Sequence, residues 1–445
     1  MKSDDALLAA WEETLQRKGD APAIFDTGGA ALRTFSDIES RARMLEAKID
    51  PAAAGHVHPI DLGNHLDWPS LLLACLRRRV VALPLESSVT PQQREAALRV
   101  CSVRDAGDWG DRPPVLLKLT SGTTAEPRAI RFRSEQLLAD CIQICDTMGI
   151  GPDDLNFGVI PLSHSYGFSN LVTPLLVRGI PMVLSRDRMP RALLDDLART
   201  GATVFPGMPV FYQAFCEMEK APVLPKLRLC LSAGATLPLE VAQKFQGKFQ
   251  RAIHSFYGSS ECGGICYDRE ARLEEPGFVG QPMEGVKLEL LDPGAPASLI
   301  RVRSEAAGDG HFPEPDDEKL GGGSFVPDDL LSKSGDGFRI VGRISDVINV
   351  AGKKVNPAEV EAELLRCPGV RAAVVFGRES LRRNEEVAAC VAAGADVRET
   401  DLLEFCRGRL SGWQVPKRIF FVDEIPVNER GKVNRRELAQ RFGSR

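Results

Sequence analysis

Residues 115–128 read VLLKLTSGTTAEPR, an apolar run followed directly by a loop of hydroxyl side chains. The apolar run, residues 115–119, has the length and composition of a buried β-strand. The next five residues carry four hydroxyls and one glycine, so their backbone N–H groups can converge on an anion. Arg128 adds a fixed positive charge that suits phosphate oxygens. The stretch predicts a strand that runs into a phosphate-binding loop made of Thr120, Ser121, Gly122, Thr123 and Thr124.

Two features limit this interpretation of the loop. An ordinary Ser/Thr-rich turn that binds no ligand has the same composition, so the composition fits both interpretations equally well. The Walker pattern GxxxxGK[ST] is absent, so the chemistry of ordinary P-loop NTPases does not fit.

On both sides of this stretch, apolar runs of strand length alternate with helical patterns. This alternation predicts α/β layers and excludes a sandwich or a bundle. The strands expected are residues 80–85, 155–160, 180–184 and 227–231, and the helices are residues 134–148 and 238–249.

The character of the chain changes after about residue 290. Residues 308–329 are rich in Gly, Pro and Asp, which predicts an exposed loop. We expect a large N-terminal domain over residues 1–342, short at its N-terminus, and a small mobile α+β domain over residues 343–445. Residues 426–438 are polar and are expected to lie outside the core. A strand is expected at 338–341, just before the boundary after residue 342. The small domain should contain a helix starting after Asn356, strands at 372–376, 387–391 and 418–422, and a helix at about 401–410.

The composition indicates a globular protein of two or three domains. Of 445 residues, 43% are hydrophobic, and 56 Lys+Arg against 61 Asp+Glu leave a net charge of −5. Such a mild charge, without a long basic run, argues against nucleic acid as a partner. No apolar run is long enough to span a membrane, and the N-terminus has no apolar signal core. These features predict a cytoplasmic protein, and they leave its oligomeric state open.

Eleven cysteines are scattered over the chain, which indicates reduced and mostly buried thiols. Two pairs have i,i+4 spacing, Cys141 with Cys145 and Cys262 with Cys266. A zinc site would need further ligands, and His254 is the sole local candidate. Core packing is therefore the favoured interpretation.

Four further segments combine residue types that can carry chemistry. Residues 161–168 place His164 beside Ser165 and Tyr166, and residues 232–237 place Gly234, Ala235 and Thr236 after a strand. Residues 255–261 combine an aromatic ring, hydroxyls and a carboxylate, which can stack on a purine, reach phosphate and hold Mg²⁺. Residues 426–438 place Lys432 after a glycine on a polar stretch. Taken singly, each segment also has a purely structural explanation as packing, turn or solvated tail.

Taken together and in order, the segments resemble the adenylate-forming superfamily of acyl- and aryl-CoA synthetases, adenylation domains and beetle luciferases. The phosphate-loop signature of that family is matched by residues 120–129, and its Tyr-Gly-x-Thr-Glu motif by residues 257–261. Its Gly-Arg-x-x-Asp-x-Ile segment is matched by residues 342–348, and its terminal Gly-Lys by residues 431–432. Weaker matches at residues 25–37, 81–84, 277–282 and 325–329 extend the resemblance over essentially the whole chain.

The resemblance implies a two-step reaction that uses ATP and Mg²⁺. A carboxylate attacks the α-phosphate to form an acyl adenylate, and a thiol then attacks that adenylate and releases AMP. The implied catalytic residues are Lys432, His164 and Glu261, and Glu261 is also the implied Mg²⁺ ligand. The implied ATP-binding residues are Thr120, Ser121, Gly122, Thr123, Thr124, Arg128, Gly234, Ala235, Thr236, Tyr257, Gly258, Ser259, Ser260, Asp329 and Arg343. The implied acyl pocket contains His164, Ser165, Tyr166 and Gly258, the thiol channel passes Gly352, and the hinge lies at Ser345.

The chain departs from the family pattern at several of these positions. Ala125 and Ala129 stand where glycines are usual, and Arg128 replaces the usual lysine. Arginine keeps the charge but presents a planar fork in place of a compact ammonium. Ser260 replaces a threonine, and Pro327 and Asp328 leave Asp329 as the ribose ligand. None of these changes removes a charge that the reaction needs.

Ser165 stands where amino-acid-activating relatives place an aspartate for the α-ammonium group. The expected substrate is therefore a fatty or an aryl acid, and these two are not separated by sequence. The expected acceptor is CoA. One alternative is transfer to the phosphopantetheine of a separate carrier protein, since we expect no carrier domain in this chain. Another is a catalytically weak nucleotide-binding homologue, which the retained Glu261, Arg343 and Lys432 argue against.

Overall fold

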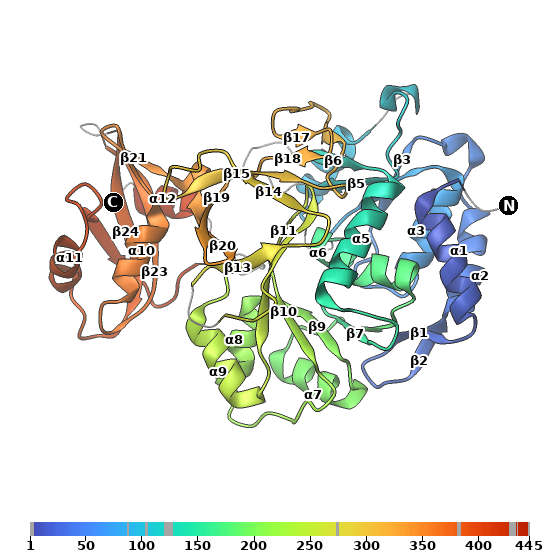
Figure 1. Ribbon diagram of the computed structural model, residues 1–445, viewed down its shortest axis with the longest axis horizontal. Helices are drawn as coiled ribbons and strands as arrows, with labels where there is room; N and C mark the ends of the chain where they lie inside the picture. The colour runs from blue at the N-terminus through green and yellow to red at the C-terminus, as the bar shows by residue number, and fades with distance from the viewer. Residues whose placement is uncertain are drawn as a thin grey trace. The chain divides into compact units, whose positions relative to one another are not determined.

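The computed structural model describes residues 4–86, 89–102, 106–119, 128–272, 276–380, 384–426, 433 and 435–443. The chain forms two compact units (Figure 1). The large unit comprises Met1–Glu289, Arg301–Val326 and Gly335–Phe338, and the small unit comprises Leu290–Ile300, Pro327–Ser334 and Arg339–Arg445. The expected α/β fold class, with a large N-terminal and a small C-terminal domain, is confirmed. The expected boundary after residue 342 stays a prediction.

The main sheet of the large unit is parallel at its centre. Its strands run in the order β13-β12-β11-β10-β9-β7-β8-β1-β2, and β1, β8, β7, β9, β10 and β11 are parallel to one another. Strands β12 and β13 continue antiparallel from β11, and β2 is antiparallel to β1. The bounds are β1 Pro22–Phe25, β2 Ala31–Thr34, β7 Asn156–Gly158, β8 Met182–Leu184, β9 Val204–Gly207, β10 Leu229–Ser232, β11 Ile253–Ser259, β12 Gly263–Tyr267 and β13 Phe278–Pro282.

A second sheet holds the strand before the phosphate loop. Its order is β16-β6-β5-β4-β3, where β5 and β6 form an antiparallel hairpin whose pairing ends at Leu119 with Ala129. The hairpin therefore brings together the two ends of the predicted phosphate loop. The bounds are β3 Val57–Ile60, β4 Val81–Pro84, β5 Leu116–Leu119, β6 Ala129–Phe132 and β16 Gly310–Phe312.

Helices cover these sheets, and their ends follow the local sequence. Helix α5 ends where Gly149 adopts a left-handed φ of 63°, which suits glycine. Helices α1, α2 and α3 pack against one another, as Figure 1 shows in blue. The bounds are α1 Ala6–Lys18, α2 Phe35–Glu46, η1 Pro51–Ala53, α3 Trp68–Arg78, α4 Pro91–Val100, η2 Ala106–Trp109, α5 Ser134–Met148, α6 Ser165–Gly167, η3 Phe168–Val172, η4 Pro174–Arg178, α7 Pro190–Thr200, α8 Pro209–Glu217 and α9 Leu239–Phe249.

The small unit contains a sheet in the order β22-β21-β24-β23, with β25 parallel to β24. As expected, Asn356 caps helix α10, because its side chain accepts the N–H of Ala358. The bounds are β21 Ile348–Val350, β22 Lys353–Val355, β23 Val370–Ser380, β24 Asn384–Ala393 and β25 Arg418–Phe421 for strands, and η5 Ile344–Asp346, α10 Pro357–Leu365, α11 Glu399–Arg407 and α12 Arg435–Gly443 for helices. The remaining strands of the chain are β14 Lys287–Leu290, β15 Ser298–Arg303, β17 Leu320–Gly321, β18 Ser324–Phe325, β19 Asp329–Ser334 and β20 Gly337–Arg343.

Two sequence-based expectations about irregular segments are wrong. Residues 308–329 are not a plain loop, because they contain β16, β17 and β18. Residues 426–438 are not all outside the core, because Leu438 is only 2% exposed and begins an apolar stripe with Phe442 on α12. Both segments are short and rich in Gly, Pro or charge, so pairing and packing with distant residues outweigh their local composition.

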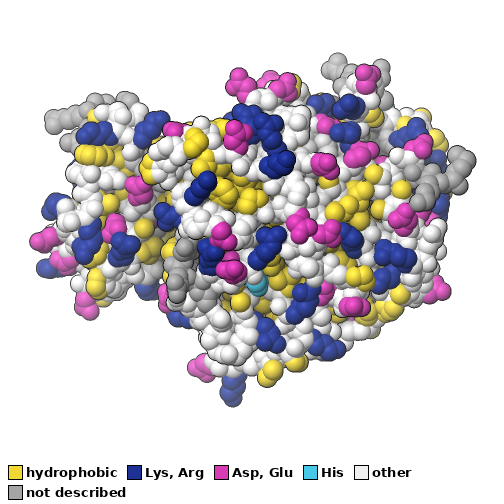
Figure 2. All heavy atoms as spheres, in the orientation of Figure 1, with side chains coloured by type: hydrophobic (Ala, Val, Ile, Leu, Met, Phe, Trp, Pro, Cys, Tyr) yellow, Lys and Arg dark blue, Asp and Glu magenta, His cyan; other side chains and the backbone are white. Residues whose placement is uncertain are grey.

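The cysteines are buried thiols, as predicted, with Cys216 partly exposed. Burial raises the pKa of the Cys75 thiol to about 12. On the face drawn in Figure 2, acidic and basic side chains are interspersed. Within the described part of the chain, no helix is long and apolar enough to cross a membrane.

Candidate active site

Three predicted site segments lie at one edge of the main sheet of the large unit. Ser232, the last residue of β10, pairs with Gly207 of β9 on one side and with Ser255 of β11 on the other. Because these strands are parallel, the segments that follow them leave the sheet at the same edge. The segments are residues 159–166 after β7, residues 233–236 after β10, and residues 257–261 at the end of β11. Ligands of open α/β sheets bind at this edge.

His164 and Tyr166 are held by backbone contacts. The Nδ1 atom of His164 accepts the N–H of Tyr166 at 3.1 Å and caps the short helix α6. The Tyr166 hydroxyl donates to the carbonyl of Gly207 at 3.2 Å, and burial raises the pKa of this phenol. A Cβ atom at Gly167 would lie 2.1 Å from the carbonyl oxygen of Pro161, so only glycine fits there.

A hydrogen bond of 3.0 Å between the hydroxyls of Ser165 and Ser260 joins the histidine segment to the turn between β11 and β12. In that turn, the hydroxyl of Ser259 accepts the backbone N–H of Glu261 at 3.2 Å. At Gly258, a Cβ atom would lie 2.7 Å from the carbonyl oxygen of Gly263, so the hairpin requires glycine. The half-buried Glu261 is thus carried on a turn with a fixed backbone.

The predicted adenine segment is exposed, whereas Tyr257 is buried. Gly234 has a φ of 86°, and Gly234, Ala235 and Thr236 are all open to solvent. Tyr257 is 8% exposed and lies in β11 opposite Cys266. The turn after β10 therefore presents backbone, which a flat ring can approach closely.

Two of the predicted sites lie outside the described residues: the phosphate loop, including Thr120, Ser121, Gly122, Thr123 and Thr124, and Lys432 itself. Arg128, just after the loop, donates from Nη2 to the carbonyl of Glu314 at 2.9 Å.

The small unit brings Asp329 and Arg343 together, because Arg343 Nε donates to Asp329 Oδ1 at 2.7 Å. Asp329 is buried and Arg343 is exposed. Ser345 lies in η5, where its hydroxyl donates to Asp346 Oδ1 at 3.5 Å. Gly352 has a φ of 86°, and its N–H donates to the side chain of Asn349 at 2.9 Å.

One arginine of the small unit was missed by sequence reasoning. Arg435 binds Asp346 at 3.0 Å and Glu361 at 2.7 Å, and it donates to the carbonyl of Val375 at 3.0 Å. It therefore connects the predicted hinge segment to the start of α12, three residues after Lys432. The sequence did contain a local signal. Leu438 and Phe442 have the spacing of one helix face, and Arg435 comes just before them.

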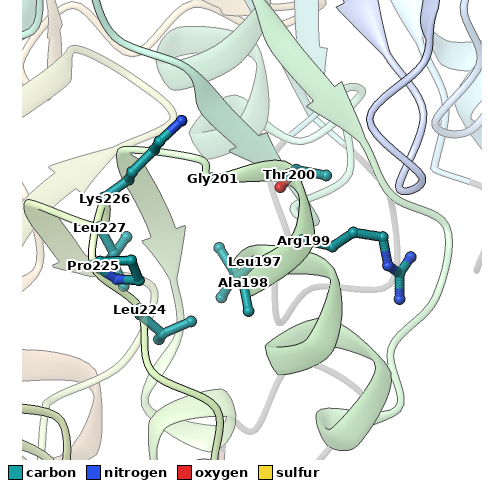
Figure 3. A pocket seen from close by; sticks show the side chains of 9 residues that line it. All are labelled: Leu197, Ala198, Arg199, Thr200, Gly201, Leu224, Pro225, Lys226 and Leu227. Carbon is teal, nitrogen blue, oxygen red and sulfur yellow. The ribbon is translucent and has the colours of Figure 1, made fainter.

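A shallow cavity lies at the opposite edge of the main sheet (Figure 3). It is formed by the end of α7 and by residues 224–227, which precede β10. Its lining contains no carboxylate, histidine or cysteine. Because it lies beside the amino ends of β9 and β10, it does not belong to the candidate site.

Comparisons with known proteins identify the family of this chain. The family described as AMP-binding enzyme matches residues 109–299, and its C-terminal domain matches residues 359–432. A feruloyl-CoA synthase of Amycolatopsis sp. is 28% identical, with 98% of this chain and 99% of that protein covered. A 3,4-dihydroxybenzoate–[aryl-carrier protein] ligase of Bacillus anthracis is 28% identical, with 73% of each covered. The structure of ATP-bound MatB from Rhodopseudomonas palustris superposes with a TM-score of 0.84 at 22% identity, covering 98% of both chains.

The two matched regions together span more than half of the chain. The chain belongs to the AMP-binding enzymes, the adenylate-forming superfamily. It is accordingly an acid–thiol ligase of the AMP-forming type, which activates a carboxylic acid with ATP.

Proposed function

We propose that this ligase converts an aromatic carboxylic acid to its CoA thioester. In the first step a carboxylate oxygen attacks the α-phosphate of ATP, and the α–β phosphoanhydride bond breaks to release pyrophosphate. In the second step the CoA thiolate attacks the acyl carbonyl, and AMP leaves with the bond electrons. The observation that carries the proposal is the meeting of the histidine, glycine and Glu261 segments at one sheet edge.

The acyl group is assigned to the side of the site lined by His164, Ser165 and Tyr166. The ring of Tyr166 packs 5.9 Å from that of Phe256, so this side is built of rigid aromatic groups. Ser165 carries no charge, and its hydroxyl bonds to Ser260, so it supplies no partner for an ammonium group. The full-length likeness to a feruloyl-CoA synthase supports an aryl acid over a fatty acid.

The residues that bind each part of ATP are proposed from the same predicted segments. The adenine is placed against residues 234–236 and Tyr257, the ribose against Asp329 and Arg343, and the triphosphate against residues 120–124 and Arg128. Lys432 is placed at the α-phosphate, and the small unit is proposed to turn about Ser345 so that the thiol enters past Gly352. The buried carboxylate of Asp329, held by Arg343, suits a ribose hydroxyl because it can accept a further hydrogen bond.

Magnesium fits the oxygen groups at the β11–β12 turn. Mg²⁺ is commonly held by one or two carboxylates together with substrate phosphates. Glu261 is half-buried and lies beside the hydroxyls of Ser259 and Ser260. When bound, Mg²⁺ would neutralise phosphate charge, and the carboxylate of Glu261 would hold it.

The acid preference is tested by pyrophosphate exchange into ATP with a panel of acids. We expect exchange with hydroxylated benzoic or cinnamic acids and none with free α-amino acids, because Ser165 cannot pair an ammonium group. Ser165→Asp serves as the comparison variant and should weaken exchange with aryl acids. Exchange with amino acids alone would contradict the substrate assignment, and exchange with long-chain acids alone would replace the aryl acid by a fatty acid.

The acceptor is tested after exchange has been established. We expect acyl-CoA to form with free CoA at a rate comparable to adenylation, detected by mass spectrometry. A carrier protein is the alternative, motivated by the aryl-carrier ligase to which the chain is similar. Thioester on an added phosphopantetheinylated carrier, with none on CoA, would decide for that alternative.

Arg128→Ala should raise the KM for ATP by roughly ten- to a hundredfold, because a charge-assisted bond to phosphate contributes about 1.5–3 kcal/mol. Arg128→Lys should recover most of this loss if only the charge matters. Steady-state exchange against ATP concentration measures both. An unchanged KM in Arg128→Ala would mean that the side chain serves the structure, as in its bond to the Glu314 carbonyl, and does not bind phosphate.

Arg435→Met should slow adenylation more than thioester formation. The substitution leaves Asp346 and Glu361 without their shared cation, so the base of the lysine segment loses its tie to the hinge segment. We expect the small unit to lose about 1–3 kcal/mol of stability and exchange to fall roughly tenfold. Arg441→Met on the same helix is the control. Equal loss in both half-reactions would show a general folding defect.

A further inference from the structure

Helix α5 buries a row of polar side chains along one face. Gln136, Asp140, Gln143 and Thr147 have the spacing of one helix face, and each of them is at most 8% exposed. A buried polar side chain costs free energy unless it forms hydrogen bonds. Each of these four side chains bonds to a segment outside the helix. The row therefore holds neighbouring segments against α5.

Asp140 is the charged member of this row, and it is 3% exposed. Its Oδ1 atom accepts the backbone N–H of Gly264 at 3.0 Å. Gly263 has a left-handed φ of 69°, and a Cβ atom there would lie 2.0 Å from the same oxygen, so the turn approaches the carboxylate as closely as a glycine permits. Asp140 thus holds the β11–β12 turn, which carries Glu261.

The other oxygen of Asp140 binds the helical segment that follows His164. Its Oδ2 atom accepts the hydroxyl of Ser169, which is 3% exposed and lies in η3. The backbone of η3 is π-helical, a rare conformation that is frequent at functional sites. One carboxylate therefore joins the turn with Glu261 to the segment with His164.

Helix α5 also holds this turn through a second segment. The backbone N–H of Gly308 donates to the carbonyl of Glu261 at 2.9 Å. The residue before it, Ala307, is bound to α5, because Nε2 of Gln136 donates to its carbonyl at 2.8 Å. The backbone around Glu261 is therefore tied to α5 at two places.

Packing alone does not require a carboxylate at position 140. Burying a charge is costly unless hydrogen bonds satisfy it, and an apolar side chain would fill the same volume without that cost. The two oxygens of a carboxylate can bind two donors at once, and bonds to a charged acceptor are stronger than bonds between neutral groups. Here the two donors belong to two segments of the candidate site that are distant in the sequence.

We propose that Asp140 is a positioning residue for the adenylation step: it fixes the turn that carries Glu261 against the segment that carries His164. The Mg²⁺ side and the acyl side of the site then keep one separation. This inference rests on the proposed function, since it takes from there the roles of Glu261 and His164. A displacement of about 1 Å in an active site can cost roughly 10² in rate, so a fixed separation has a measurable effect.

The experiment compares Asp140→Ala, Asp140→Asn and Ser169→Ala with the control Thr147→Val. Asparagine keeps the size of the aspartate side chain and an oxygen for the N–H of Gly264, and its amide group can donate to the Ser169 hydroxyl. The control removes another buried bond of the same helix face, which Thr147 accepts from the N–H of Glu284 at 3.0 Å. The readouts are amide hydrogen–deuterium exchange of the β11–β12 turn by mass spectrometry, the rate of pyrophosphate exchange over a series of Mg²⁺ concentrations, and the midpoint of thermal unfolding.

We expect Asp140→Ala to speed amide hydrogen exchange in the β11–β12 turn, to slow pyrophosphate exchange roughly 10²-fold and to raise the half-saturating Mg²⁺ concentration. Asp140→Asn should lose at most about tenfold in rate, because both bonds remain possible without the charge. Thr147→Val should lower the unfolding midpoint yet leave the other two readouts at their wild-type values.

Ser169→Ala tests the proposal even if Asp140→Ala does not fold, because it removes a single hydroxyl. It should slow pyrophosphate exchange roughly three- to tenfold. A wild-type rate in Ser169→Ala would overturn the proposal, as would a loss in Asp140→Asn as large as that in Asp140→Ala. Unchanged amide hydrogen exchange of the turn in Asp140→Ala would overturn it as well. Since the amide measurement needs no turnover, failure of the proposed function would be recognised separately, as a wild-type protein without pyrophosphate exchange.

Discussion

Lys432→Ala should lose most pyrophosphate exchange while keeping the second half-reaction. Negative charge builds on the α-phosphate oxygens as the adenylate forms, and a lysine placed there stabilises that transition state. Donors of this kind contribute about 3–4 kcal/mol, or roughly 10²–10³ in rate. In the proposed mechanism, thiol attack occurs at a carbonyl already activated by AMP, after the small unit has turned. Chemically supplied acyl adenylate should therefore still be converted to thioester at nearly the wild-type rate.

Three outcomes at this position have different meanings. Loss of exchange with normal thioester formation supports a mobile lysine. Little change in either step would mean that residues 426–438 act only as a polar segment. Equal loss in both steps would indicate a folding or docking defect of the small unit. Lys417→Ala, an exposed lysine of the same unit, controls for the loss of one positive charge.

Glu261→Gln should reduce exchange by roughly 10²–10³. The amide keeps the size and the hydrogen-bonding reach of the carboxylate but carries no charge to hold Mg²⁺ against the triphosphate. The backbone of the turn should survive, because Ser259, Gly258 and Asp140 fix it through contacts that do not use the Glu261 carboxylate.

The Glu261 experiment measures the exchange rate over a series of Mg²⁺ concentrations. We expect the half-saturating Mg²⁺ concentration to rise along with the loss of rate, and Glu284→Gln, an exposed position, to behave as wild type. An exchange rate and Mg²⁺ dependence equal to those of the wild type would remove Glu261 from the catalytic site.

Local sequence predicted some of the elements that bring the site together. The apolar runs before residues 161 and 232 become β7 and β10, and the expected helix at residues 134–148 is α5. These signals suffice because parallel strands with apolar sequences send their following loops to one edge. The segments at His164 and Gly234 follow strands that were expected, whereas the position of Glu261 depends on β11, a strand that was not predicted.

The remaining parts of the site depend on contacts between distant residues. Arg435 and Asp346 are 89 residues apart, and Asp140 and Gly264 are 124 apart, so no local pattern pairs them. A lysine inside the apolar run VLLKL was visible in the sequence, but the aromatic rings of Phe132 and Phe168 that contact it come from other segments. The burial of Leu438 and Phe442 was not predicted either, because charged residues surround these two positions in the sequence, whereas the residues they pack against lie on the sheet.

The central claim is that this chain makes an acyl adenylate and transfers the acyl group to a thiol. The most direct measurement incubates the protein with ATP, Mg²⁺, a hydroxycinnamic acid and CoA, and quantifies AMP and thioester together by chromatography and mass spectrometry. We expect AMP and acyl-CoA in equal amounts, both dependent on the acid, with AMP release falling sharply when CoA is omitted. Release of ADP in place of AMP, or AMP formation independent of any carboxylic acid, would contradict the account.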